Sequence, residues 1–172
     1  MKPMDLVKKV RREATFERAA LDRGKAVLMA AIRQEAERQR RPTIVPQLPY
    51  EDIRAALEFL ERAFGFREIP TSRRVSETGM IGHTMVEFGD GVIGLGTQGA
   101  HGARSPQSGG IASQYISVRV DDVDAHYQRA LAAGARIASG LRDHSRGVRA
   151  YEALDVEGHR WRFLQQREVP SP

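Results

Sequence analysis

The sequence contains no cysteine, which excludes disulfide bonds and thiolate metal sites. It also lacks long hydrophobic runs, because no apolar stretch approaches the ~20 residues that a membrane-spanning helix needs. The first residues are charged rather than apolar, which does not match a secretory signal segment. We therefore expect a cytoplasmic protein that has no membrane partner.

Net positive charge is absent outside one end of the chain. Residues 1–42 carry 12 Lys and Arg against 6 Asp and Glu, a net charge of +6, while the other 130 residues carry 15 against 16, a net of −1. Most of the chain is therefore close to neutral, and we do not expect nucleic acid as a partner. The hydrophobic fraction of 41% is sufficient for a buried core.

Residues 1–41 are predicted to form a basic amphipathic helical extension, which Gly24 should kink or divide and Pro42 should end. Its apolar stripe needs burial, so we favour packing on the following domain or on a second subunit. Binding to an acidic surface or nucleic acid, and contact with a membrane surface, are the alternatives. The stripe consists of Val7, Val10, Ala14, Leu21, Leu28 and Ile32.

From Thr43 onward the same pattern occurs twice. The segments "IVPQLPYEDIRAALEFLERAFGF" and "YISVRVDDVDAHYQRALAAGARI" each contain a short apolar strand, an acidic turn and an amphipathic helix that ends in glycine. Three strand-like segments follow each helix. We therefore predict an α+β domain over residues 43–168, built from βαβββ units at 43–97 and 113–166 and joined by a Gly/Ser-rich linker at 98–112.

These two segments, followed by "DVEGHRWRF", resemble the vicinal-oxygen-chelate superfamily, also called the glyoxalase/bleomycin-resistance/dioxygenase group. The resemblance covers residues 43–166. It implies eight strands around a U-shaped cleft, and dimerisation. In metal-dependent members, the first and last strand of each unit carry one metal ligand each.

The implied ligand positions do not hold metal-binding side chains. They fall on Val45, Gly94, Tyr115 and Arg162, which offer an aliphatic group, no side chain, a phenol and a cation. The five histidines lack ligand spacing. We therefore expect neither a metal nor another cofactor, and we assign no catalytic residue.

Strand alternation places another set of polar side chains in the cleft. We predict that Gln47, Tyr115, Ser117 and Arg162 bind an organic ligand, and that an anion would suit the guanidinium. Alternatively, Arg162 pairs with a nearby carboxylate such as Glu87. Trp161 and Phe163 alternate with Arg162 and should face the helices.

The sequence thus favours a metal-independent, homodimeric protein that binds a small organic molecule in its cleft. The specific function that we expect is sequestration of a toxic compound or antibiotic, as the resemblance to the bleomycin-resistance members implies. One alternative is a glyoxalase-like lyase or isomerase, or a dioxygenase-family enzyme, that uses Tyr115, Arg162 or a histidine. The other is a regulatory or interaction protein that acts through the basic extension.

Overall fold

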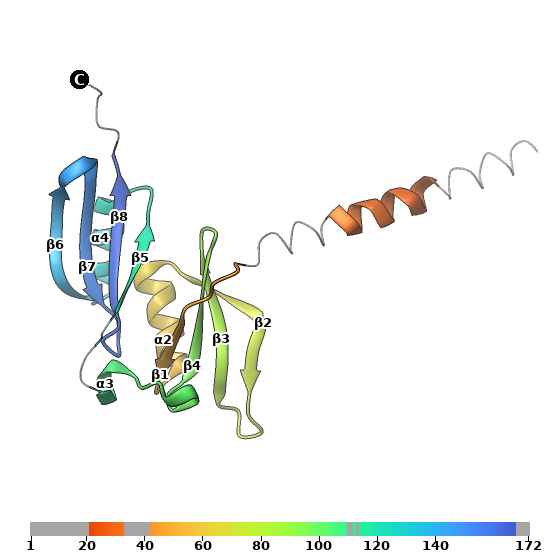
Figure 1. Cartoon of the computed structure of the whole chain (residues 1–172), viewed down its shortest axis with the longest axis horizontal. Coiled ribbons are helices and arrows are strands. Elements are labelled where there is room, and N and C mark those ends of the chain that lie inside the picture. Colours follow the sequence, from red (N-terminus) through yellow and green to blue (C-terminus); the bar gives the residue numbers. More distant parts are fainter. Residues whose placement is uncertain (1–20, 33–41, 110–111, 113, 168–172) are drawn as a thin grey trace, which may run out of the picture. The chain divides into compact units, whose positions relative to one another are not determined.

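The computed structural model describes residues 21–32, 42–109, 112 and 114–167 (Figure 1). The chain contacts divide it into two units, Met1–Thr43 and Ile44–Pro172. In the first unit, residues 21–32 are one uninterrupted helix. Gly24 lies inside this helix, so the helix is not divided at this glycine, and the alternative, a kink, stays a prediction. The rest of the predicted extension, and its end before Pro42, lie outside the described residues.

The second unit begins with a βαβββ motif whose helix has the predicted ends. The side chain of Asp52 caps the helix by accepting a hydrogen bond from the backbone N–H of Ala55 at 3.0 Å. The helix continues as a π-helical turn, η1, and Gly65 ends it in the left-handed region at φ 77°. The elements are β1 (Gln47–Tyr50), α2 (Ile53–Phe59), η1 (Leu60–Phe64), β2 (Arg67–Val75), β3 (Ile81–Phe88) and β4 (Gly91–Thr97).

The second motif repeats the first. Asp122 caps its helix through the N–H of Ala125 at 2.9 Å, and Gly134 follows the helix at φ 82°. Short helical segments, η2 (Ala100–Gly102) and α3 (Pro106–Gly109), lie in the linker, and η3 (Ser145–Gly147) joins two strands. The elements are β5 (Tyr115–Arg119), α4 (Val123–Ala132), β6 (Arg136–His144), β7 (Val148–Leu154) and β8 (Arg160–Gln166).

Each motif forms its own four-stranded sheet. The strand orders are β1-β4-β3-β2 and β5-β8-β7-β6, and in both sheets the first and last strands of the motif pair in parallel. The two four-stranded mixed sheets with their helices confirm the predicted α+β class and are consistent with the expected pair of βαβββ units. We call them sheet A and sheet B.

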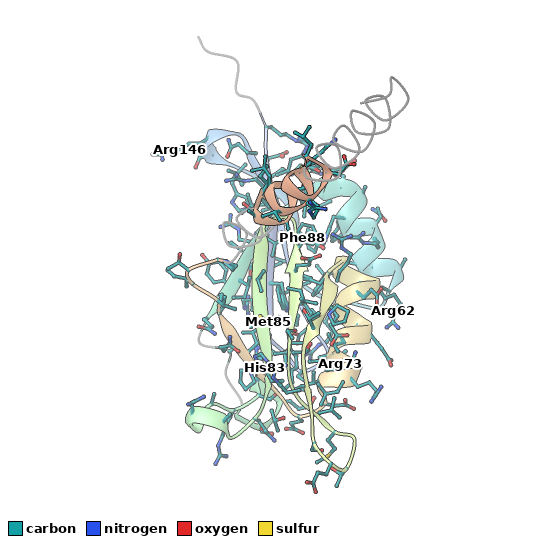
Figure 2. The ribbon with its side chains drawn as sticks, turned by 90° about the vertical axis from the view of Figure 1, so that its right-hand side faces the viewer. Arg62, Arg73, His83, Met85, Phe88 and Arg146 are labelled. Carbon is teal, nitrogen blue, oxygen red and sulfur yellow. The ribbon has the colours of Figure 1, made fainter. Side chains whose placement is uncertain are left out.

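An aromatic core lies between the helices and the two sheets. The ring of Phe64, from η1, lies 5.8 Å from that of Trp161 and 4.7 Å from that of Phe163, both on β8. These β8 side chains are fully buried, so they face the helices as expected. Figure 2 shows α2 and α4 on the same side of the strands, with Arg62 projecting away from them. The helices therefore cover one face of each sheet.

The turn that follows β7, within "DVEGHRW", joins the two motifs. The buried carboxylate of Asp155 accepts hydrogen bonds from the Tyr50 hydroxyl at 2.6 Å and from the Trp161 indole at 3.0 Å. Glu157, also buried, accepts from the backbone N–H groups of Glu51 and Asp52 at 2.8–3.0 Å. The acidic residues of this segment therefore hold sheet B against the junction of β1 and α2.

Candidate functional site

The candidate site lies on the sheet faces that point away from the helices. On β3, Thr84 and Val86 are buried on the helix side, and the alternating His83 and Met85 lie on the other face. Figure 2 labels both of these open-face residues. We use "open face" for this side of each sheet.

Gln47 occupies the open face of sheet A at the position beside Gly94. The two residues are register partners in the parallel pair of β1 and β4. A Cβ atom added to Gly94 would overlap the carboxamide of Gln47, so the glycine leaves room for this side chain. The strand position opposite Gly94 is therefore Gln47, whereas Val45 precedes the strand.

Tyr115, Ser117 and Arg162 come together on the open face of sheet B. Ser117 and Arg162 are register partners in the pair of β5 and β8, and Tyr115 pairs in the same way with Arg160. The Tyr115 side chain is 54% exposed. Three of the four predicted ligand-binding residues thus share one face, while Gln47 belongs to the other sheet.

The open face of sheet B is rich in guanidinium groups. Its one carboxylate among the register-paired positions is Glu152, which forms an ion pair with Arg160 at 2.9 Å. Glu87, considered above as a partner for Arg162, pairs instead with Arg67 at 3.3 Å. Among the residues that the structure describes, no carboxylate lies within salt-bridge distance of Arg162. The register places these arginines on the face: Arg119, Arg136, Arg142, Arg160 and Arg162.

A cavity of about 570 Å³ lies at one end of this face. Arg136 and Arg160 supply its cationic wall, and Leu154 and Val156 supply apolar wall. Pro106 of α3 closes it from the linker. The volume is within the usual range of small-molecule sites.

The donor set does not fit a metal ion. The register positions Gln47, Gly94, Ser117 and Arg162 provide one carboxamide, one hydroxyl and one cation, which is not the ligand set of a divalent metal. Across the described ranges, no three His, Cys, Asp or Glu side chains gather closely enough to hold a metal.

Three groups with shifted pKa values lie in the core rather than on an open face. Burial lowers the pKa of His126 to about 4. Burial likewise raises the pKa of Tyr151, whose hydroxyl lies 2.7 Å from Nδ1 of His126. Burial, reinforced by the charge of Asp155, raises the pKa of Tyr50 well above its ordinary value. These shifts result from burial in the packed interior, and none of them identifies an acid or a base at the candidate site.

Sequence reasoning missed Arg136 and Leu154 as candidate ligand contacts. The two are register partners on β6 and β7, and Leu154 is in turn the partner of Arg160. Strand alternation would have placed Leu154 on this face together with Glu152. A bulge in β6 interrupts the alternation there, so the face on which Arg136 lies could be determined only from the structure.

The family model that describes the Glyoxalase/Bleomycin resistance protein/Dioxygenase superfamily matches residues 40–163. The chain therefore belongs to this superfamily. An uncharacterized protein of Mycobacterium bovis is 32% identical over 133 residues, which cover 74% of this chain and 86% of that protein. An uncharacterized Mycobacterium tuberculosis protein has the same identity, with 77% of its length covered.

Solved structures show the same fold. The crystal structure of TioX from Micromonospora sp. ML1 is 33% identical, with a TM-score of 0.60, and covers 74% of this chain and 100% of TioX. A glyoxalase/bleomycin resistance protein/dioxygenase family enzyme from Burkholderia phytofirmans PsJN is 23% identical, with a TM-score of 0.55 and coverage of 70% and 95%. None of the described helices has the length and apolar character needed to cross a membrane.

Proposed function

We propose that the protein binds a small organic molecule on the open faces of its sheets without a metal ion. The observation that carries this proposal is the side-chain set at two register pairs, each of which joins the first and the last strand of one motif. Gln47 lies over Gly94 on one sheet, and Arg162 stands beside Ser117 on the other. A carboxamide, a hydroxyl and a guanidinium recognise an organic ligand through hydrogen bonds.

A homodimer completes this site in our proposal. The helices and the aromatic core cover one face of each sheet, and Tyr115 on the other face is largely exposed. The two sheets also remain separate four-stranded units. A second copy of the chain would supply the opposite wall and so place Gln47 of one copy across from Arg162 of its partner.

Sequestration of a toxic compound or antibiotic is the specific role that we propose. The support is membership of a superfamily that includes bleomycin resistance proteins, together with the carboxamide, hydroxyl and guanidinium that Gln47, Ser117 and Arg162 present at the register-paired positions. Such a protein protects by binding its compound tightly and releasing it unchanged.

Thermal unfolding in the presence of a panel of antibiotics and other small organic compounds tests this function. A compound that binds only the folded protein at 100 times its dissociation constant stabilises it by about 2.7 kcal/mol, which raises the melting temperature. We expect at least one compound to do so in the presence of EDTA. Arg162→Gln should abolish the shift, whereas Arg62→Gln, on the exposed side of the helices, should preserve it.

Recovery of the bound compound separates binding from catalysis. After prolonged incubation, mass spectrometry should find the compound chemically unchanged and in a fixed ratio to the protein. Conversion of the compound would instead support the lyase, isomerase or dioxygenase alternative. No stabilising compound in a broad panel, or a shift that Arg162→Gln leaves intact, would contradict the proposed site.

A further inference from the structure

We infer that the ligand is an organic anion with an apolar body, and that Arg136 and Arg160 bind its anionic group in the cavity at the linker end of sheet B. This inference rests on the proposed function, because it assigns the chemical class of the molecule held by the same open face. It also assigns charge recognition to residues other than Gln47, Tyr115, Ser117 and Arg162.

The register defines this end of the face. Arg136, Leu154 and Arg160 follow one another across β6, β7 and β8 as register partners, so their side chains lie on one side of the sheet. Arg162 is two residues beyond Arg160 on the same strand and therefore shares that side. The cavity is thus continuous with the face that carries Ser117 and Tyr115.

The Arg136 guanidinium lies close to Gly158 in the turn after β7. A Cβ atom built on Gly158 would lie 3.7 Å from Nη2 of Arg136 and 3.5 Å from Cβ of Pro106. The guanidinium therefore lies against the turn after β7, beside the linker helix α3. Gly158, with a φ of 90°, itself lines the cavity between these two residues.

The charges on this face favour an anion. Arg160 has Glu152 as its ion-pair partner, but no described carboxylate lies within salt-bridge distance of Arg136. Glu157 is the one carboxylate in the cavity wall. It is buried and already accepts hydrogen bonds from two backbone N–H groups and the hydroxyl of Ser105. Arg136 therefore remains to bind a carboxylate or a similar planar anion, and Arg160, which uses Nη1 for Glu152, can donate from its other guanidinium nitrogens.

The apolar part of the ligand is indicated by the other walls. Leu154, Val156 and Pro106 line the cavity, and Val156 is 41% exposed. A volume of about 570 Å³ exceeds what an inorganic anion requires. Burial of an apolar body against these side chains adds affinity that a bare phosphate or sulfate ion cannot gain.

Titration calorimetry with two probes of equal shape tests the charge preference. The probes are 2-naphthoate and its uncharged analogue 2-naphthamide, with inorganic phosphate as a third arm. We expect naphthoate to bind at least about tenfold more tightly than naphthamide, since hydrogen bonds to a charged group are the stronger kind. Phosphate should compete only weakly, because it lacks the apolar body.

Two variants of the same strand locate the anion site. Arg136→Gln should weaken naphthoate binding at least about tenfold and leave naphthamide unchanged. Arg142→Gln is the matched control, because Arg142 lies on the same face as the partner of Ala150, at the other end of β6. It should leave both affinities within about twofold. Backbone amide shifts in NMR spectra should cluster at residues 136 and 154–160.

The failures of the two proposals have different signatures. Equal binding of both naphthyl probes, with amide shifts around Tyr115, Ser117 and Arg162, would overturn the anion assignment and leave the proposed binding function standing. Unchanged naphthoate binding by Arg136→Gln, or no binding of naphthoate to the unmodified protein, would overturn the cavity assignment. The compound panel tests the binding function independently of these probes.

Discussion

Asp155 shows how much of the fold depends on one buried side chain. Its carboxylate accepts hydrogen bonds from the Tyr50 hydroxyl, the Trp161 indole and the backbone N–H groups of Glu157 and His159. Asp155→Ala would leave these buried donors without their acceptor, and we expect the free energy of unfolding to fall by about 3 kcal/mol or more.

Urea unfolding of the two variants Asp155→Ala and Asp121→Ala measures this effect. Asp121 is exposed in the turn between β5 and α4, so its replacement by alanine should change the unfolding free energy by less than about 0.5 kcal/mol. Equal stability of the two variants would show that the network around Asp155 does not hold the two motifs together.

His126 gives the fold a dependence on pH. Its Nε2 donates to the Phe64 carbonyl at 3.1 Å, so the neutral ring has an unprotonated Nδ1 that accepts from the Tyr151 hydroxyl at 2.7 Å. Burial lowers the pKa of this imidazole to about 4. The unfolded chain takes up this proton near pH 6.5, before the folded chain does. The contribution of His126 to the unfolding free energy is therefore fully present above pH 6.5. It decreases by roughly 3 kcal/mol as the pH falls to about 4.

Unfolding free energies at several pH values between 7.5 and 4.5 test this dependence. His126→Gln removes the titrating group, so the variant should lose less stability than the unmodified protein over the same interval. Carboxylates contribute equally to the pH dependence of both proteins. The difference between the two slopes of unfolding free energy against pH is therefore due to His126. Parallel curves would contradict the assignment.

Short-range patterns made the helices of both motifs predictable. Asp52 and Asp122 cap them, and Gly65 and Gly134 follow them with positive φ values, as the repeated sequence indicated. The buried Trp161 followed from strand alternation. Contacts such as that from Tyr50 to Asp155, 105 residues apart, depend on how the motifs pack, and no local pattern contains that information.

The turn between β7 and β8 requires a positive φ at one residue. Gly158 has a φ of 90°, where a residue with a Cβ is strained, and its N–H donates to the Asp155 carbonyl at 3.2 Å. We expect Gly158→Ala to lower the unfolding free energy by about 1–2 kcal/mol.

Gly96→Ala is the matched comparison within a strand. Gly96 lies in β4 on the open face, and no other group lies within 4 Å of a Cβ built there. This variant should keep or slightly raise the stability of the protein. If thermal unfolding finds both variants equally stable, the strain assigned to the turn is absent.

Deletion of residues 1–41 separates the contribution of the extension from that of the domain. If the open faces form the dimer interface, a chain without residues 1–41 should still have twice its own monomer mass in light scattering. It should also keep its affinity for the ligand. A monomeric truncated chain would assign the interface to the extension.

Loss of a macromolecular partner with ligand binding intact would support the regulatory alternative for the basic extension. A pull-down with the full chain and the truncated chain, each with its ligand affinity measured in parallel, distinguishes this outcome. We expect both chains to bind the small molecule equally, because residues 1–41 contribute none of the proposed ligand contacts.

The loss of the superfamily's metal chemistry is the central claim, and elemental mass spectrometry tests it most directly. The protein is purified without a chelating tag, exposed to Ni, Zn, Mn and Fe, and freed of excess metal. We predict far less than one metal ion per chain, because Gln47 on β1 pairs with Gly94, and Ser117 on β5 pairs with Arg162 on β8, which together do not form the ligand set of a divalent metal. A near-stoichiometric metal content would contradict the account and give first place to an enzymatic function.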